Sequence, residues 1–195
     1  MKNYLIFITF NLFLLLPLHG QNDKINETII IKTGLGDIIV SLDLKNAPVT
    51  SANFLRYVDS NLLDSTCFYR VVRMDNQPRD SVRIEVIQGG RYKDEENGFT
   101  PIAHETTNIT GLKHLDGVIS MARSAPGTAT SEFFICIGDQ PDLDFGGKRN
   151  RDGQGFAAFG RIERGMDVVL KIHSIKAPGQ YLDKPVKILT VKRVN

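Results

Sequence analysis

Arg70 is the residue of this 195-residue chain whose position best suits a chemical role. It lies in the run CFYRVV, Cys67–Val72, in which all the other residues are apolar or aromatic. Strand alternation would place Arg70 on one face with Phe68 and Val72, and Tyr69 on the other face. A guanidinium among apolar neighbours can donate strong hydrogen bonds to a ligand. The alternative is an ordinary solvated arginine on an outward face, because arginine is rarely fully buried.

Two further segments carry residue types suited to binding. The stretch GVISMARSAPGTATSEFF, which ends at Phe134, sets two apolar strand-like pieces around a loop, Ala125–Thr130, with proline and glycine punctuation. This pattern predicts the rim of a pocket. Phe134 could line that pocket or belong to the core. Gln88, in the run VIQGG, could bind a ligand or be a turn residue before the two glycines.

Hydrophobic patterns predict the elements that position these residues. Two apolar runs around Gly34-Leu35-Gly36 are typical of a β-hairpin within residues 28–43. Asn46, a capping residue type, precedes a helix that starts near Pro48 and ends at Asp59. A second helix is predicted within residues 165–175. Further strands are predicted at Cys67–Arg73, Val82–Ile87, Gly117–Met121, Ser131–Ile137, Phe156–Ile162 and Val186–Val194.

This density of short strands is typical of a sandwich or a barrel. We predict a mainly-β fold, a closed eight-stranded antiparallel barrel capped by two α-helices. The helices would cover the apolar side chains that closure leaves exposed at the two openings.

The segments around Cys67–Val72, Val86–Gly90 and Ser131–Phe134, in this order, resemble the cyclophilin family of peptidyl-prolyl isomerases along nearly the whole chain after its N-terminal segment. The resemblance implies that Arg70 is the catalytic cation, that Phe134 is the floor of a proline pocket and that Gln88 bonds the substrate backbone. It also implies substrate contacts for Val86, Ala122, Arg123, Glu132, Leu143 and Phe156.

Four positions depart from the pattern usual in that family. Tyr69 stands where a histidine usually precedes the arginine, and Glu85 stands where a pocket phenylalanine is usual. Glu132 replaces a glutamine, and Phe156 replaces a common histidine. An acid at position 132 could pair with Arg70 and either orient it or compete with the substrate.

The N-terminus has the features of a secretory signal peptide. Lys2 is followed by an apolar stretch of about 15 residues, from Tyr4 to Leu18, and then by small or polar residues. The apolar stretch is shorter than the roughly 20 residues that span a bilayer, which disfavours a retained anchor. We therefore expect a signal peptide at residues 1–20, an isomerase domain at 28–195, and a periplasmic or secreted protein.

Composition argues against several partners. Loss of Lys2 leaves 23 basic and 22 acidic residues, and the basic residues between Arg70 and Lys93 alternate with acidic ones. No nucleic acid is therefore expected as a partner, and no insertion into the membrane after signal removal. His104, His114 and His173 lack the spacing of metal ligands, so no metal or cofactor is expected. Cys67 and Cys136 resemble small buried hydrophobes. The expected form is a monomer.

These features lead to three functional hypotheses. The first is a peptidyl-prolyl isomerase that acts on unfolded or folding exported proteins containing proline. The second is a non-catalytic chaperone or assembly module that holds proline-containing segments in the same groove. The third is a structural barrel whose rim serves only protein contacts. Binding of proline peptides, with or without faster cis/trans exchange, separates the three.

Overall fold

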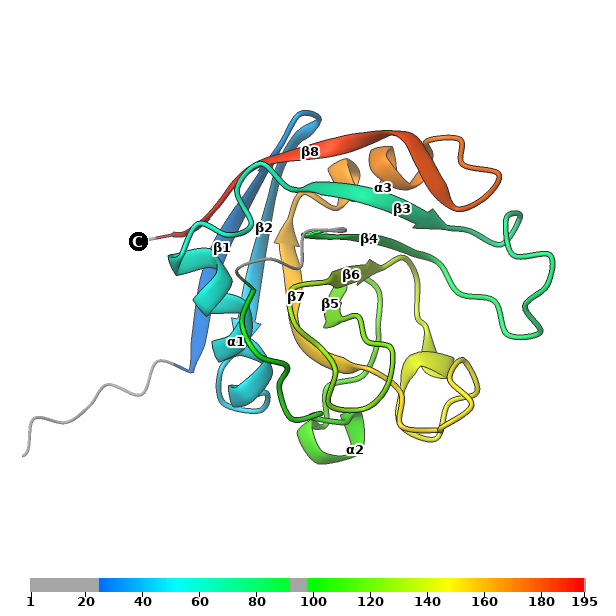
Figure 1. Ribbon diagram of the computed structural model, residues 1–195, viewed down its shortest axis with the longest axis horizontal. Coiled ribbons are helices and arrows are strands. Elements are labelled where there is room, and N and C mark those ends of the chain that lie inside the picture. Colours follow the sequence, from blue (N-terminus) through cyan, green and yellow to red (C-terminus); the bar gives the residue numbers. More distant parts are fainter. Residues whose placement is uncertain (1–24, 92–97, 195) are drawn as a thin grey trace, which may run out of the picture.

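The computed structural model describes residues 25–91 and 98–194. Its eight strands close into one antiparallel barrel in the order β1-β2-β7-β5-β6-β4-β3-β8 (Figure 1), which confirms the predicted architecture. The strands are β1 Asn26–Thr33, β2 Gly36–Asp43, β3 Cys67–Val72, β4 Val86–Gly90, β5 Val118–Met121, β6 Phe133–Cys136, β7 Ala157–Arg164 and β8 Tyr181–Arg193. The predicted signal peptide lies outside the described residues. Among the residues described, none of the helices has the length and apolar content needed to cross a membrane.

The hairpin of β1 and β2 shows why this sequence forms a barrel wall. Ile29 and Ile31 on β1, like Ile38 and Val40 on β2, are fully buried, whereas the residues between them are more exposed. This period of two sends alternate side chains into the barrel. The interior is therefore a packed apolar core, and a ligand must bind on the outside of the barrel or at its rim.

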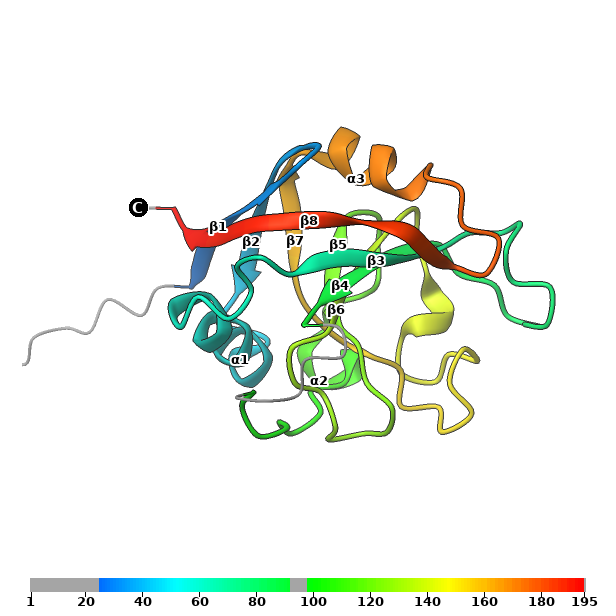
Figure 2. The same cartoon turned by 45° about the horizontal axis from the view of Figure 1, so that its top comes forward.

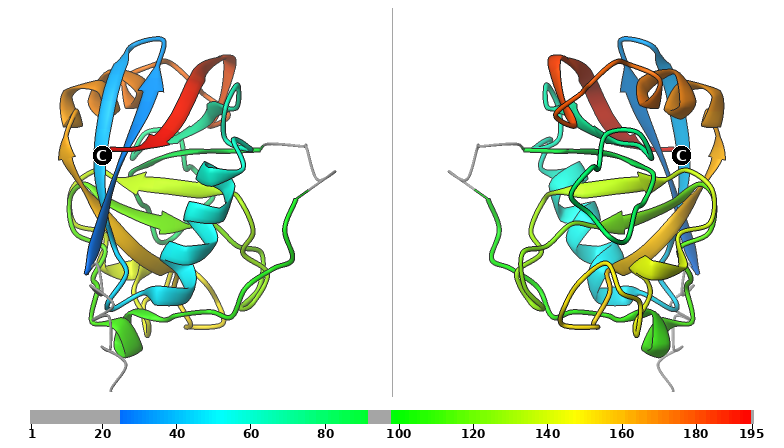
Figure 3. Two further views of the ribbon diagram at one scale, coloured as in Figure 1. Left: turned by 90° about the vertical axis from the view of Figure 1, so that its left-hand side faces the viewer. Right: turned by 90° about the vertical axis from the view of Figure 1, so that its right-hand side faces the viewer.

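The two predicted helices are confirmed as α1, Pro48–Asp59, and α3, Met166–His173. α1 follows β2 and α3 follows β7, and these strands pair antiparallel. The two helices therefore lie at opposite ends of the barrel, with α3 at the top and α1 below it in Figure 3. A third helix, α2, is a single turn at Thr107–Thr110 that the sequence analysis did not predict. A 3-10 turn also occurs at Pro141–Leu143.

The start of α1 differs from the prediction in its cap. The N-cap residue is Ala47, and the side chain of Asn46 donates to the Asp43 carboxylate instead. The backbone N–H groups of Val49 and Thr50 donate to the two oxygens of Glu105, at 3.1 and 2.7 Å. A carboxylate 55 residues further along the chain thus satisfies the first turn of α1. Such a cap exists only in the folded chain.

Each predicted strand overlaps an observed one, and the largest differences are at the starts of β4 and β8. β4 begins at Val86 rather than at Val82, because the buried side chain of Gln77 takes the place of a strand partner. Its amide donates to the Ile84 carbonyl at 2.8 Å and accepts from the Ile84 N–H at 3.2 Å. β8 begins at Tyr181, five residues before the predicted start, and it contains Pro185, a residue that cannot complete a regular ladder.

A β-bulge in β3 changes the predicted alternation around Arg70. Phe68 pairs with Gly89 and Arg70 with Gln88, so Tyr69 is the extra residue relative to β4. Phe68 consequently lies in the barrel core, as does Val71. The predicted shared face of Phe68 and Arg70 is therefore wrong. The bulge directs Arg70 outward and leaves the Phe68 ring inside the barrel.

The two glycines that the sequence analysis placed in a turn are the last residues of β4. A Cβ atom on Gly89 would lie 2.8 Å from the Phe68 ring and 2.9 Å from the Cys67 carbonyl oxygen. Gly90 has a φ of +137°, and its Cβ would lie 2.6 Å from a carboxylate oxygen of Glu132. Only glycine allows this close approach of β4 to its neighbours.

We expect Gly89→Ala to lower the free energy of unfolding by about 2 kcal/mol, because the new methyl group must displace the Phe68 ring or the backbone of β3. Urea denaturation of both proteins measures the difference. Gly34→Ala is the matched control, since no atom lies within 4 Å of the position of its Cβ. A Gly89 variant as stable as the Gly34 variant would contradict the tight approach.

Candidate active site

Three predicted site residues form one row across the outer face of the barrel. Gln88 on β4 pairs with Arg70 on β3 and with Phe134 on β6. Residues that pair directly across neighbouring strands point to the same side of a sheet. The barrel therefore holds a cation, an amide and an aromatic ring side by side, although the three residues are far apart in the sequence.

A cavity of about 130 Å³ lies over this row. Its walls include eight of the nine predicted site residues, the exception being Glu132. The lining consists of Arg70, Ile84, Val86, Gln88, Ala122, Arg123, Phe134, Leu143, Arg149 and Phe156. Six of these ten residues are apolar, so the cavity suits a small apolar group next to a polar one.

Phe134 forms the apolar floor of this cavity. It is 5% exposed and packs with Val72, Val86, Cys136 and Leu143 in a cluster separate from the barrel core. The Phe156 ring meets it edge to face, with centroids 5.2 Å apart. Phe156 thus extends the aromatic wall at the position where the sequence analysis noted a departure from a common histidine.

A buried polar cluster supports the floor from behind. The His114 ring stacks on Phe134 with 6.0 Å between centroids. Its Nδ1 lies 2.8 Å from Asp144 Oδ1, and its Nε2 lies 2.9 Å from the Ser120 hydroxyl. Burial raises the pKa of Asp144, but hydrogen bonds from His114 outweigh that effect and hold it below the usual range. His114 is therefore a buried histidine whose two ring nitrogens both have protein partners.

Arg70 is held between two glutamine side chains. Its Nη1 donates to Gln88 Oε1 at 2.9 Å, and its Nε and Nη2 donate to Gln180 Oε1 at 3.1 and 2.5 Å. The guanidinium also lies over the Tyr181 ring, 5.9 Å from its centroid. Burial lowers the pKa of Arg70, yet a guanidinium stays protonated in proteins. The alternative of an ordinary solvated arginine is therefore wrong: the side chain points outward from the barrel but is half-buried and held by hydrogen bonds.

Gln180 is a residue of the site that sequence reasoning missed. It has a left-handed backbone, with φ of 71°, just before β8. Its backbone carbonyl accepts from the Val71 N–H at 2.8 Å, and its side-chain amide donates to the Asn76 carbonyl at 3.2 Å. These bonds point its side-chain oxygen at Arg70. Figure 2 shows β3 and β8 side by side, which is the seam where this contact forms.

Glu132 lies in a neighbouring cavity of about 610 Å³, whose wall shares Gln88, Ala122 and Arg123 with the smaller one. Its Oε2 accepts from the Tyr69 hydroxyl at 2.5 Å. The direct pair with Arg70 that the sequence analysis considered does not form, because Tyr69 and Gln88 lie between the two charges.

Glu85 lines neither cavity, and Ile84 and Val86 border the smaller one instead. Glu85, which stands where a pocket phenylalanine is usual in the family, therefore adds no carboxylate to the wall of either cavity. Arg149 also borders the cavity and was not predicted. Its Nη1 donates to the Val82 carbonyl at 2.6 Å and to Gln77 Oε1 at 3.1 Å, which fastens the loop after β3.

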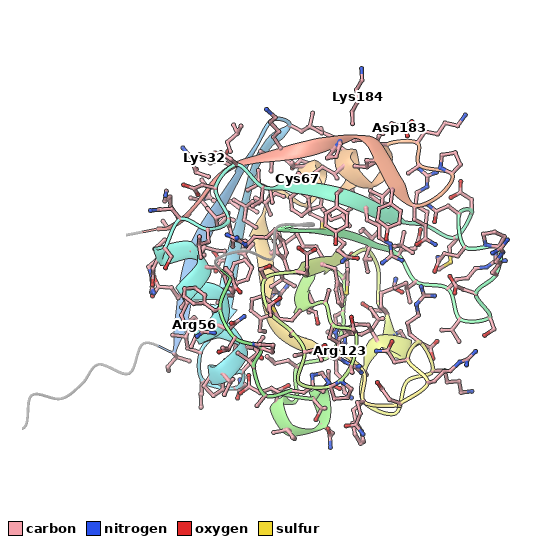
Figure 4. The ribbon with its side chains drawn as sticks, viewed as in Figure 1. Lys32, Arg56, Cys67, Arg123, Asp183 and Lys184 are labelled. Atoms are coloured by element: carbon pink, nitrogen blue, oxygen red, sulfur yellow. The ribbon has the colours of Figure 1, made fainter. Side chains whose placement is uncertain are left out.

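Arg123 joins the chain after β5 to the loop before β7 (Figure 4). Its Nη1 and Nη2 donate to the two Asp152 oxygens at 2.8 and 2.9 Å, and its Nε donates to the Gly155 carbonyl at 2.8 Å. The Ala122 N–H donates to the Glu132 carbonyl at 2.8 Å. Peptide pairing along this edge, which the resemblance implied, would therefore use backbone groups other than that N–H.

The Arg123–Asp152 pair predicts a pH-dependent stability. The guanidinium and the Gln154 N–H lower the pKa of Asp152 to about 2. Because the folded-state pKa is depressed, the stabilisation is complete above the unfolded-state pKa and is lost as the pH falls through about 2. We expect Asp152→Asn to lower the urea midpoint at neutral pH, with a difference from wild type that shrinks below about pH 4.

The matched control is Asp167→Asn, which removes an exposed pair with Lys171 on α3. Exposed pairs of this kind contribute little, so its urea midpoint should stay close to that of the wild type at neutral pH. Equal midpoints for the wild type and the Asp152 variant at neutral pH would contradict a stabilising role of the pair.

Within residues 25–91 and 98–194, no three His, Cys, Asp or Glu side chains gather in a way that could hold a metal ion. Cys67 and Cys136 are both free thiols, the first half-buried and the second buried. Burial raises the pKa of both thiols.

The fold and the site define a class: a closed barrel that presents a fixed guanidinium and a small aromatic-floored cavity on its outer surface. Comparison with known proteins gives the family. The family model for cyclophilin type peptidyl-prolyl cis-trans isomerases matches residues 28–193. The chain is 35% identical to a peptidyl-prolyl cis-trans isomerase of Acinetobacter baylyi over 86% of this chain and 85% of that protein.

A second relative, peptidyl-prolyl cis-trans isomerase B of Escherichia coli, is 32% identical over 85% of this chain and 97% of its own length. Among solved structures, a Cryptosporidium parvum cyclophilin superposes with a TM-score of 0.69 at 20% identity, covering 87% of this chain and 98% of that one. The chain belongs to the cyclophilin-type peptidyl-prolyl cis-trans isomerases. This membership favours the isomerase over the non-catalytic module.

Proposed function

We propose that this isomerase accelerates X-Pro rotation in exported proteins while they fold, with Arg70 as the catalytic group. The observation that carries the proposal is the guanidinium of Arg70, fixed by Gln88 and Gln180 beside the cavity whose floor is Phe134. The unfolded form of such a client holds about 10–30% cis at X-Pro bonds and exchanges slowly, which makes acceleration useful.

The chemistry follows from amide resonance. Rotation about an X-Pro bond is opposed by a barrier of about 18–20 kcal/mol, because the twisted state loses the partial double bond. In that state the prolyl nitrogen is pyramidal and can accept a hydrogen bond, which the planar amide nitrogen cannot. A donor that meets only the twisted state lowers the barrier, at about 1.36 kcal/mol for each tenfold gain in rate.

Arg70 has donors available for this role. A guanidinium carries five N–H groups, and three are engaged by Gln88 and Gln180. One N–H on each terminal nitrogen remains uncommitted within the described part of the chain. Because the glutamines already restrict the side chain, little conformational entropy is lost when a substrate is bound. Phe134 and Phe156 offer the apolar surface that a pyrrolidine ring buries.

The client class is supported by two observations of different kinds. The Cryptosporidium cyclophilin was also solved in the presence of the dipeptide Ala-Pro, which supports proline as the anchor. The apolar stretch after Lys2 supports export. We propose that the protein acts in the periplasm or outside the cell, as a monomer.

Two measurements test the proposal. In the first, refolding of an exported protein with a proline-limited slow phase is followed with and without the purified isomerase, and we expect that phase to become faster. In the second, cell fractionation and mass spectrometry of the intact protein should find it outside the cytoplasm, cleaved near Gly20. An unchanged slow phase with bound client would favour the chaperone hypothesis, and a full-length cytoplasmic protein would overturn the export part.

A further inference from the structure

We propose that Glu132 is a positioning residue that orients Arg70 through a directed chain of hydrogen bonds, Arg70 to Gln88 to Tyr69 to Glu132. This inference rests on the proposed catalytic function of Arg70 and adds two residues to it. Neither Glu132 nor Tyr69 borders the small cavity over Phe134. Their hydrogen bonds reach Arg70 through Gln88.

The chain of hydrogen bonds is continuous, and each bond is short. Arg70 Nη1 donates to Gln88 Oε1 at 2.9 Å. Gln88 Nε2 donates to the Tyr69 hydroxyl oxygen at 2.6 Å. The Tyr69 hydroxyl donates to Glu132 Oε2 at 2.5 Å. Four side chains from β3, β4 and the segment just before β6 thus connect a cation to an anion through two neutral groups.

The direction of the chain follows from the chemistry of its ends. A guanidinium can only donate, and a carboxylate can only accept. Gln88 and Tyr69 can each do both, so the two charged ends determine which way the amide and the hydroxyl point. With an ionised Glu132, the arrangement that satisfies every member places the Gln88 oxygen toward Arg70.

A glutamine at position 132 would remove this constraint. Its amide could donate to the Tyr69 oxygen, Tyr69 could then donate to Gln88 Oε1, and Gln88 would turn its NH₂ group toward Arg70. Two donors would then face each other, and Arg70 would lose one of its two glutamine partners. A carboxylate at position 132 therefore excludes the reversed direction of these hydrogen bonds, because it cannot donate to Tyr69.

The surroundings of Glu132 support a fixed carboxylate. Tyr69 is 5% exposed, and its ring stacks on Tyr181 with 6.2 Å between centroids, which holds the hydroxyl in place. Gly90 lets the backbone of β4 approach Glu132, since a Cβ there would lie 2.6 Å from Oε1. The strand bulge at Tyr69 is what brings its hydroxyl and the Arg70 guanidinium to the same side of the barrel.

Protonation of Glu132 would permit the same reversal, so the orientation of Arg70 should depend on pH. Burial raises the pKa of Glu132, although hydrogen bonds from Tyr69 and Gln88 act in the opposite direction. Other titratable or charged groups nearby in the described structure are Tyr57 on α1, Cys67, Tyr69 and Arg70 on β3, Arg91 after β4, and Arg123 after β5. Burial raises the pKa of Cys67 and Tyr69, so they stay protonated in acid and near neutrality.

The test combines kinetics with a direct view of Arg70. Isomerisation of a proline test peptide is measured for the wild type, Glu132→Gln, Tyr69→Phe and the double variant between about pH 4 and 8. We expect each single variant to lower kcat by about fivefold with little change in KM. The kcat of the double variant should be no lower than that of the less active single variant, because both substitutions break the same chain of hydrogen bonds. The wild type should lose kcat as the pH falls through a value above the usual range of glutamate, and Glu132→Gln should lack this decline.

The second readout is the NMR signal of the Arg70 Nε–H group. It should shift with pH in the wild type and stay constant in Glu132→Gln and in Tyr69→Phe. Thr130→Val, which changes another polar wall of the larger cavity, is the matched control and should behave like the wild type in both measurements.

Each outcome decides the inference. Additive effects of the two substitutions, a Glu132→Gln enzyme with wild-type kcat, or an acid decline that persists in that variant would overturn it while leaving isomerisation by Arg70 intact. An inactive wild type would instead contradict the proposed function. In that case the NMR titration still confirms or rejects the chain of hydrogen bonds.

Discussion

Replacement of Arg70 by alanine is expected to lower kcat/KM for a proline test peptide by about two to three orders of magnitude, the usual cost of removing a donor aimed at the transition state. The variant loses the group that can donate to the twisted prolyl nitrogen, whereas Phe134 and the apolar wall remain. Peptide binding should therefore weaken far less than turnover. Exchange NMR measures both quantities on the same sample, because it reports the cis/trans rate and the bound fraction.

Two controls make this prediction specific to the donor. Circular dichroism and urea denaturation should show a folded Arg70→Ala protein, since the side chain lies outside the barrel core. Arg70→Lys keeps the charge but cannot reproduce three N–H bonds to Gln88 and Gln180. Its activity should be intermediate. Full activity of a folded Arg70→Ala protein would remove Arg70 from the mechanism.

The second large effect is expected at Phe134. Phe134→Ala should lower the free energy of unfolding by about 3 kcal/mol, at the low end for buried phenylalanine because one side of the ring already borders a cavity. It should also raise KM by about tenfold or more, since the pyrrolidine ring loses the surface on which it is buried. Urea denaturation and steady-state isomerisation, measured below the onset of unfolding, separate the two effects.

The neighbouring residue offers a matched control for this prediction. Phe133 points into the barrel, where its ring meets Phe54 and Phe68 with centroids 5.3 and 5.6 Å away. Phe133→Leu and Phe134→Leu should each cost about 1 kcal/mol of stability. Only the second should raise KM. Equal kinetic effects of the two would mean that stability, not the cavity floor, explains the loss of activity at Phe134.

The position of the site on the barrel explains how it can be both rigid and open. Its functional side chains lie on the outer faces of β3, β4 and β6, whereas the inner faces of the same strands fill the core. Strands held on both sides by neighbours move little, so the row of Arg70, Gln88 and Phe134 is preorganised. The outward side chains Asp183 and Lys184 on β8 lie away from this row and are exposed (Figure 4).

Much of the fold could be predicted from local patterns. The hairpin of β1 and β2 and the helix from Pro48 to Asp59 both have a period of side-chain burial that the sequence displays directly. The strand that contains Phe134 is a short apolar run whose residues are all buried. Predictions were weaker where one buried polar side chain changes the local structure. A strand was expected from Val82, but the Gln77 side chain binds the backbone N–H and carbonyl of Ile84. Nothing near Gln77 in the sequence indicates which backbone groups its side chain will bind.

The sequence by itself determined the barrel, the helices α1 and α3 and the residue types of the site, because hydrophobic periodicity and the order of three motifs can be read along the chain. The tertiary structure decided how those residues act together. The bulge at Tyr69 sets the direction of the Arg70 side chain. The hydrogen bonds of Arg70 to Gln180 join residues 110 positions apart, and the hydrogen bond of Tyr69 to Glu132 joins residues 63 positions apart. Hydrogen bonds over such separations form only when the barrel closes, since closure alone brings β8 beside β3 and β6 beside β4.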